Sequence, residues 1–327
     1  MSNKIKFSSG LHVFGNTLDR FVGGGYKENR TLEQMFSDAA KVKDLEGVEL
    51  VGNWHINENN VDQVKELSKK HNLAITMVVV DIFTQSKWSM GSFAAKDPAI
   101  KKQAIEDVKK YLDLTAEVGC DLIDLWFAHD GFDYSFQADF IGAWQDIIEG
   151  VKECADYRTD MRLGIEYKIK EPRTHIHIGT IGKVLALLSK VAKDNVGIII
   201  DVGHSLCAYE NMAETIALCK LFDDKLFHLH LNDNYRAWDD DMLVGSVHLQ
   251  EYLELLYWVK KVGYTGWYSL DVFPYREDGI KSADESIEWL KAMIAAVDSV
   301  DDKEIEAVIK TGDGVEALAL MRKMLFK

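Results

Sequence analysis

The chain has 327 residues, of which 47% are hydrophobic, so it is long enough to bury the core of one large domain. Its formal net charge of -15 would repel the phosphate backbone of nucleic acid, and no basic stripe with interleaved aromatic residues offsets that charge. We find neither an apolar signal segment nor an apolar run of about 18 residues, so we expect a cytoplasmic protein without a membrane partner.

Short apolar segments alternate with longer helical patterns along the chain, which predicts parallel strands joined by helical crossovers. The predicted strands are 6–14, 48–52, 74–81, 121–127, 162–167, 196–201, 226–231 and 267–272. The predicted helices are 32–43, 60–71, 98–118, 136–157, 181–193, 209–220, 247–262 and 281–297. Eight such units favour an α/β fold of the (β/α)8 TIM barrel type over an open doubly wound sheet.

The end of the chain predicts a short extension of this barrel. A Thr-Gly-Asp-Gly turn at 311–314 precedes one further amphipathic helix, from Val315 to Phe326. No linker rich in proline, glycine or serine divides the chain. We therefore predict one barrel over residues 1–298 and a helical tail over 299–327, which either covers the barrel wall or contacts a neighbouring subunit.

Seven acidic and imidazole side chains follow the later predicted strands. They are Glu166, Asp201, His204, His230, Asp239, Asp241 and Asp271. The carboxyl ends of barrel strands meet on one face, so we expect these side chains to lie together. A shared divalent cation would keep the buried carboxylates ionised, and oxygen mixed with imidazole suits Mg, Mn or Co. The set therefore predicts a metal site.

The early members of this set also fit ordinary structural roles. Glu166 and Lys168 alternate along a strand, so both would face the barrel axis, where they could form an internal salt bridge, while Tyr167 points into the helix layer. Asp201 and His204 have the spacing of an Asx turn with a capping histidine. The alternative is that both are ligands of adjacent ions.

The later members of the set differ in how well a purely structural role would explain them. Asp239 and Asp241 taken alone could be a solvated acidic loop. Of His228 and His230, we expect one to face away from the site, and we favour His230 as the inward one. Few structural roles require an acid such as Asp271 at the end of an apolar strand. The agreement of several independent strand ends favours the metal site.

With these residues in view, the chain resembles xylose isomerases. Residues 166–173, Glu-Tyr-Lys-Ile-Lys-Glu-Pro-Arg, are similar to that family's E-P-K-P-N-E-P-R signature, and the Asp-Val-Gly-His of 201–204 is similar to its E-V-G-H. Blocks at 7–15, 83–85, 91–93, 113–119, 125–126 and 129–131 are similar in the same order. The resemblance covers roughly residues 5 to 295.

The resemblance implies two divalent cations. Glu166, Asp201, His230 and Asp271 would hold a first, structural ion that grips sugar hydroxyls. Asp201 as the bridge, His204, Asp239 and Asp241 would hold a second, more mobile ion. Xylose isomerases have Glu and Asp where this chain has Asp201 and His230, so its Glu-Asp-His-Asp set is instead similar to that of rhamnose isomerases of the same superfamily.

The resemblance also implies roles around the metal site. The expected catalytic residues are Lys168, Glu166, Asp271 and His55. The expected sugar contacts are Trp126, Phe93, His12 and His129. Lys168 would polarise the sugar carbonyl, and Trp126 and Phe93 would wall the apolar side of the pocket. His55 is the histidine nearest to the family's ring-opening position at the end of the second strand, displaced by a few residues.

The implied function is a cytoplasmic, homodimeric or homotetrameric isomerase of a free monosaccharide. It would convert D-xylose to D-xylulose, or a related aldose to its ketose, by a two-metal hydride shift. Three alternatives remain. A ketose 3-epimerase uses the same barrel with one metal, carboxylate-mediated proton transfer and characteristically Glu as the last ligand. An endonuclease IV-type hydrolase requires further histidine ligands and DNA. A sugar-binding relative would have lost the chemistry.

Overall fold

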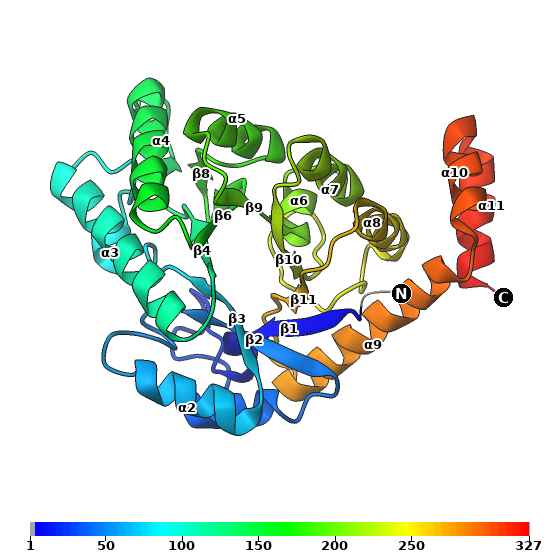
Figure 1. Ribbon diagram of the computed structural model, residues 1–327, viewed down its shortest axis with the longest axis horizontal. Helices are drawn as coiled ribbons and strands as arrows, with labels where there is room; N and C mark the ends of the chain where they lie inside the picture. The colour runs from blue at the N-terminus through cyan, green and yellow to red at the C-terminus, as the bar shows by residue number, and fades with distance from the viewer. Residues whose placement is uncertain (1–3, 327) are drawn as a thin grey trace.

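The computed structural model describes residues 4–326, in which eight parallel strands close into a barrel inside a layer of helices (Figure 1). The barrel strands are β1 (Lys6–Gly10), β2 (Leu45–Val51), β3 (Ala74–Val79), β4 (Leu122–Trp126), β6 (Arg162–Glu166), β9 (Val196–Asp201), β10 (Leu226–Leu231) and β11 (Trp267–Leu270). They follow this order around the barrel, and β11 closes it against β1, with Lys6 opposite Trp267. The predicted TIM barrel is confirmed.

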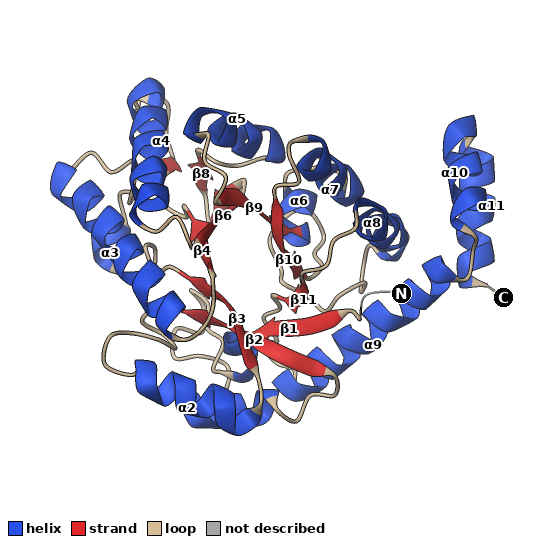
Figure 2. Cartoon of the chain, in the orientation of Figure 1, coloured by secondary structure: helices blue, strands red, loops and turns tan. Residues whose placement is uncertain are grey.

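The helices follow the strands and cover the outside of the barrel (Figure 2). The outer helices are α1 (Leu32–Ala39), α2 (Val61–His71), α3 (Pro98–Glu117), α4 (Phe140–Tyr157), α5 (Ile181–Val191), α7 (Met212–Leu221), α8 (Leu249–Val262) and α9 (Gly279–Asp298). Short helices η1 (Leu11–Phe14), η2 (Ser86–Trp88) and α6 (Val202–Cys207) follow β1, β3 and β9. Because both faces of the strands are covered, β9 is buried along its whole length.

Two local structures above the barrel differ from the prediction. The first strand ends at Gly10 rather than continuing to residue 14, because residues 11–14 form η1. A Cβ at Gly10 would lie 2.2 Å from the ring of His12, so glycine lets that histidine fold back over the strand end. A small sheet of β5 (Gly131–Phe132), β8 (Thr174–Ile176) and β7 (Lys170–Glu171) also covers one side of the barrel mouth.

The tail contains two helices rather than the single one predicted. They are α10 (Asp302–Thr311) and α11 (Gly314–Leu325), joined at Gly312 in the left-handed region (φ 65°). Lys260 and Lys261 of α8 pair with Asp302 and Glu306 of α10 at 2.9 Å and 2.8 Å, so the tail lies beside the helix layer. None of the helices within residues 4–326 combines the length and the apolar character that crossing a bilayer requires.

Candidate active site

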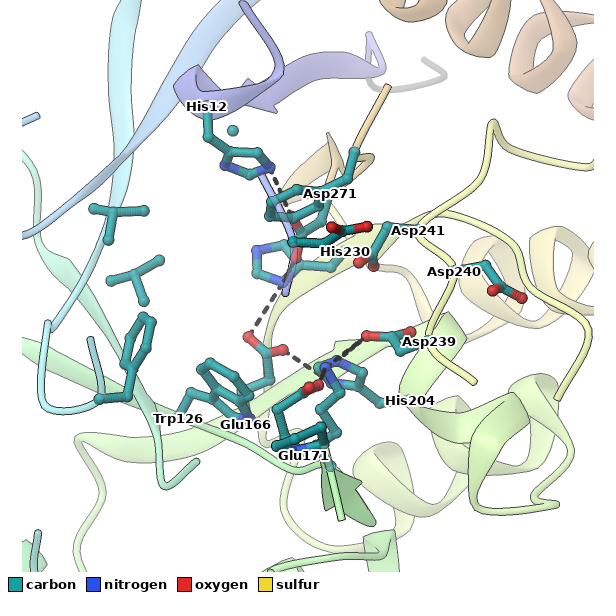
Figure 3. A pocket seen from close by; sticks show the side chains of 18 of the residues that line it. His12, Trp126, Glu166, Glu171, His204, His230, Asp239, Asp240, Asp241 and Asp271 are labelled. Carbon is teal, nitrogen blue, oxygen red and sulfur yellow. Dashed lines mark hydrogen bonds and ion pairs between the residues drawn. The ribbon is translucent and has the colours of Figure 1, made fainter. Parts of the chain in front are cut away.

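A cavity of about 800 Å³ opens at the carboxyl ends of the barrel strands (Figure 3). Each barrel strand, or the loop that follows it, contributes to the wall of the cavity. All seven predicted metal ligands except Asp201 line this cavity, and Asp201 lies immediately behind it with a fully buried side chain. The fold therefore brings together residues that are separated by more than a hundred positions in the chain.

Four of the predicted ligands form one compact group. Glu166, Asp201, His230 and Asp271 each offer one ligand atom, and these atoms all lie within 4.8 Å of one another. Glu166, Asp201 and His230 end or nearly end β6, β9 and β10, and Asp271 directly follows β11. The register of the sheet sets this arrangement, because His230 lies directly opposite Asp201 on the neighbouring strand.

A second group shares one member with the first. Asp201, His204 and Asp239 also offer ligand atoms within 4.8 Å of one another, and His204 Nε2 lies 3.1 Å from Asp239 Oδ2. Asp241 lines the cavity beside this group rather than within it. The Asn232 amide links the two, since Nδ2 donates to Asp201 Oδ2 at 2.9 Å and to Asp241 Oδ1 at 3.3 Å.

The Asx turn considered as an alternative is also present. Asp201 Oδ1 accepts a hydrogen bond of 2.9 Å from the backbone N–H of His204 and thereby caps α6. The cap holds the His204 ring against Glu166, with Nδ1 2.9 Å from Oε1 (Figure 3). The structural role and the ligand role are therefore compatible, because the turn is what aims His204 into the cavity.

The nitrogen atoms of this site fit a divalent cation. Nδ1 of His204 and Nδ1 of His230 are buried, and neither has a hydrogen-bond partner in the described part of the chain. Both nevertheless lie close to the Glu166 carboxylate, at 2.9 Å and 3.3 Å, without the alignment of a hydrogen bond. Imidazole nitrogen and carboxylate oxygen facing one another in this way suit an ion of the Mg, Mn or Co type between them.

The pKa of Asp201 also favours a cation at this site. Burial raises the pKa of Asp201 to about 7, with His204 opposing the rise and Asp239 and Glu166 adding to it. The carboxyl is therefore hard to ionise without a neighbouring cation. A bound divalent ion would remove this penalty, because opposite charge nearby favours the ionised form.

Lys168 is held over the cavity by acids other than Glu166. Its Nζ lies 2.5 Å from Glu171 Oε2 and 2.8 Å from Asp239 Oδ2, and it stands 5.1 Å from the centre of the Trp126 ring. Burial lowers the pKa of Lys168, but Asp239 and Glu171 outweigh it and hold that pKa well above its ordinary value. Lys168 is thus a fixed positive charge beside the second group rather than the partner of Glu166.

Two residues predicted to touch a sugar do not line the cavity. Phe93 is 1% exposed and packs edge-on against Phe127 at 5.3 Å, because Asp130 draws its backbone into the helix layer with a hydrogen bond of 3.1 Å. His129 lies within hydrogen-bond distance of the Phe83 carbonyl oxygen, with Nε2 at 3.1 Å. Phe83 itself lines the cavity and forms the apolar wall that the sequence assigned to Phe93.

The structure brings His12, and not His55, to the cavity. His55 is 3% exposed, its Nδ1 accepts a hydrogen bond of 2.9 Å from the Val51 backbone, and burial, reinforced by His12, lowers its pKa to about 3. His12 lines the cavity, where its ring stacks on Phe273 at 4.4 Å and Nε2 lies 3.1 Å from Asp271 Oδ1 (Figure 3).

The structure also shows polar residues that the sequence reading missed. Glu49 on β2 contacts both His228 and His230, and Asp124 on β4 lines the cavity floor. As expected, His230 lines the cavity and His228 does not, but both rings lie on the same side of β10 and meet Glu49, because residues two apart on a strand point to the same side. Burial and neighbouring Glu166 raise the pKa of Asp124 well above its ordinary value. The available signal was an acid within the apolar run of each strand.

Known proteins resemble this chain in both sequence and fold. A family model described as a xylose isomerase-like TIM barrel matches residues 36–293. A xylose isomerase from Thermus thermophilus is 26% identical over 229 residues, which are 67% of this chain and 59% of that protein. The chain thus spans less than two thirds of the length of this relative.

Solved structures resemble the chain over most of its length. A D-tagatose 3-epimerase-like protein is 18% identical and covers 90% of this chain and 99% of its own, with a TM-score of 0.66. A D-psicose 3-epimerase from Clostridium cellulolyticum H10 is 14% identical and covers 89% of this chain and 99% of its own, with a TM-score of 0.69. A xylose isomerase domain protein from Alicyclobacillus acidocaldarius is 14% identical and covers 90% of this chain and 100% of its own, with a TM-score of 0.67. At these identities the likeness shows the shared fold.

Proposed function

The chain belongs to the xylose isomerase-like TIM barrel family, which includes sugar isomerases and epimerases, and from this premise we propose that it is a cation-dependent aldose–ketose isomerase. Its substrate would be a free sugar, D-xylose or a related aldose, which it would convert to the ketose. The family membership agrees with the resemblance seen in the sequence. The choice of reaction within the family rests on the geometry of the cavity.

The observation that carries this proposal is the double membership of Asp201. Its carboxylate belongs both to the group with Glu166, His230 and Asp271 and to the group with His204 and Asp239. A carboxylate shared by two ligand groups is the arrangement that holds two cations side by side. We therefore propose two divalent cations as cofactors, one of which Glu166, His230 and Asp271 would hold and the other His204 and Asp239, each together with Asp201.

The reaction needs charge stabilisation more than it needs a strong base. Hydrogen moves from C2 to C1 of the aldose with its bonding electrons, and a proton moves from O2 to O1, so C2 is oxidised and C1 is reduced within one molecule. Bound divalent cations would lower the pKa of the C2 hydroxyl and offset negative charge on O1. The buried Lys168 ammonium can donate a hydrogen bond to O1 from its place beside the second group.

The cavity walls would orient the sugar for this step. Trp126 and Phe83 meet edge to face at 4.7 Å and form an apolar wall, against which the C–H face of a sugar can lie. On another side, His12 lines the cavity with Nε2 3.1 Å from Asp271 Oδ1 but without the alignment of a hydrogen bond, so the imidazole can accept the proton of a ring hydroxyl with a carboxylate beside it to stabilise the resulting charge. We therefore assign ring opening to His12 rather than to His55.

A second candidate function is a ketose 3-epimerase, and the solved structures favour it. Epimerases match this chain over 97–99% of their own length, whereas the xylose isomerase is matched over 59%. In this alternative Glu166 and Asp271, both in the first group, would remove a proton from C3 and return it on the opposite face. The second group and Lys168 would then contact the substrate without a second ion.

One experiment separates the two reactions. The protein is stripped of metal, reloaded with Mg, Mn or Co, and incubated with a panel of aldoses and ketoses in heavy water, and the products are followed by NMR. Metal-dependent aldose–ketose conversion with little deuterium at carbon supports the isomerase. Inversion at C3 with deuterium uptake replaces it with the epimerase, and the absence of any metal-dependent conversion contradicts both.

A further inference from the structure

Glu49 connects one strand of the barrel to the metal-binding histidine on another. It lies on β2 and reaches β10, where Oε1 is 2.6 Å from His228 Nε2 and Oε2 is 3.0 Å from His230 Nε2. The side chains of all three residues are at most 4% exposed. Each carboxylate oxygen of Glu49 therefore serves one imidazole ring, inside the barrel and away from bulk water.

This contact determines which nitrogen of His230 faces the ligand group. A neutral imidazole has one N–H and one lone pair, and an ionised carboxylate only accepts hydrogen bonds. When Nε2–H donates to Glu49, the lone pair is on Nδ1. That atom faces Glu166, Asp271 and Asp201, with oxygens at 3.3 Å, 3.7 Å and 3.9 Å, and it has no hydrogen-bond partner among residues 4–326.

His228 fixes the position of Glu49 in turn. The rings of His228 and His230 are 5.4 Å apart and nearly perpendicular, at 87°, so each approaches a different oxygen of the same carboxylate. A carboxylate bound at only one oxygen could rotate away from its partner. With both oxygens engaged, the plane of the Glu49 carboxylate is fixed, and so is the orientation of the His230 ring.

We propose that Glu49 is a positioning residue of the metal centre, which sets the tautomer and ring orientation of His230 so that Nδ1 is available as a ligand. The inference rests on the proposed cation site and goes beyond it, because Glu49 belongs to neither ligand group that would hold the two ions. Glu49, His228 and His230 form a third cluster, but its nitrogen–oxygen distances of 2.6 Å and 3.0 Å are those of direct hydrogen bonds. An outer carboxylate of this kind also makes the imidazole a stronger donor, and its loss typically costs about 10–100-fold in metal affinity.

The test is binding of Mn²⁺ to metal-stripped protein, measured by calorimetry and by electron paramagnetic resonance. Glu49→Gln keeps the size of the side chain but presents one acceptor and one donor to two rings that both donate. We expect Mn²⁺ to bind this variant about 10–100-fold more weakly than the wild type. Glu46→Gln is the matched control, because Glu46 is on the same strand but pairs outside with Lys4 at 2.8 Å.

A second variant and a spectrum keep the proposal testable if Glu49→Gln fails to fold. His228→Gln retains an N–H donor for Glu49 and should bind Mn²⁺ within about threefold of the wild type, since the Glu49 carboxylate still accepts a hydrogen bond from His230. Histidine ¹⁵N NMR of the magnesium-loaded wild type should show a proton on Nε2 of His230 and none on Nδ1.

Several results would overturn the inference. A proton on Nδ1 of His230 in the magnesium-loaded protein contradicts it, as does a folded Glu49→Gln variant with the Mn²⁺ affinity of Glu46→Gln. If the wild type itself binds no Mn²⁺, the proposed cation site fails as well, and with it the proposed function. If the wild type binds Mn²⁺ and Glu49→Gln binds it equally well, only the proposed role of Glu49 is rejected.

Discussion

Replacing Asp201 by asparagine should have opposite effects with and without metal. In metal-free protein, burial and neighbouring acids raise the pKa of Asp201 from 3.8 to about 7. A carboxyl whose folded-state pKa is raised destabilises the fold as pH increases through that window, between about pH 4 and pH 7. At about 1.4 kcal/mol for each factor of ten in the protonation equilibrium, the ionised carboxyl costs about 4 kcal/mol above pH 7.

Asparagine removes this cost but introduces a smaller one. Its Oδ1 can still cap α6 at the His204 N–H, whereas its amide would face the Asn232 amide, donor against donor, in place of the hydrogen bond of 2.9 Å. Such a mismatch costs about 1–3 kcal/mol. We therefore expect Asp201→Asn to be more stable than the wild type at pH 8 in EDTA, by about 1–3 kcal/mol.

Metal should reverse this order. Mn²⁺ would bind only the folded wild type and would stabilise it by an amount that grows with the logarithm of its concentration, whereas the variant lacks the shared carboxylate. Sugar conversion by the variant should fall by at least about a hundredfold. Urea unfolding followed by tryptophan fluorescence, with EDTA and with Mn²⁺, measures the first effect, and NMR of the sugar measures the second.

The control for this experiment is Asp240→Asn. Asp240 lines the same cavity but belongs to neither ligand group, so this variant should keep the response of the wild type to Mn²⁺. The reasoning is refuted if Asp201→Asn is less stable than the wild type in EDTA at pH 8. It is equally refuted if Mn²⁺ stabilises this variant as much as the wild type.

Three further predictions address the walls of the cavity. Lys168→Met should lower kcat/KM, measured by NMR, by about 100–1,000-fold, whereas the affinity for Mn²⁺, measured by calorimetry, should fall little. Equal losses in both quantities would contradict a catalytic role. Phe83→Ala should raise KM by about tenfold in initial-rate assays, whereas Phe93→Ala should cost about 3–5 kcal/mol of stability in urea unfolding and leave KM unchanged. His12→Gln should slow turnover of a cyclic sugar by about a hundredfold in stopped-flow assays, while His55→Gln should change it little. The opposite result would assign ring opening to His55.

The clustering of the candidate metal ligands could be predicted from the sequence, because each of them lies at or after a strand end and the barrel brings the strand ends together. An acid or histidine that ends an apolar strand, such as Glu166 or Asp201, is visible in a few residues of sequence. Once the strands form a barrel, all of these ends meet on one face, so no knowledge of contacts is needed. Asp241 is harder to predict because it lies in a loop: the sequence placed it correctly at the cavity but could not show that it lies outside both ligand groups.

Other parts of the site depended on contacts that the local sequence does not encode. Glu49 meets His230 across 181 positions, and nothing near either residue indicates the pairing. Phe93 and Phe83 could be distinguished only by knowing that Asp130 draws the backbone of residues 92–94 inward. The expected role of His55 depended on a histidine after β2 reaching the cavity, whereas the histidine that lines the cavity is His12 after β1, which Gly10 lets fold over the barrel mouth.

The attachment of the tail has a consequence for how the molecule opens. Exposed lysines of α8 hold α10 through ion pairs that water and salt weaken, and in α10 and α11 only Ile305 and Met324 are buried within the described chain. We therefore expect local stability to be lower here than in the barrel, so that the helical pair opens as a unit while the barrel stays closed. Within the described residues nothing beyond Tyr275 lines the cavity, so the tail can vary in sequence and length without altering the chemistry of the site.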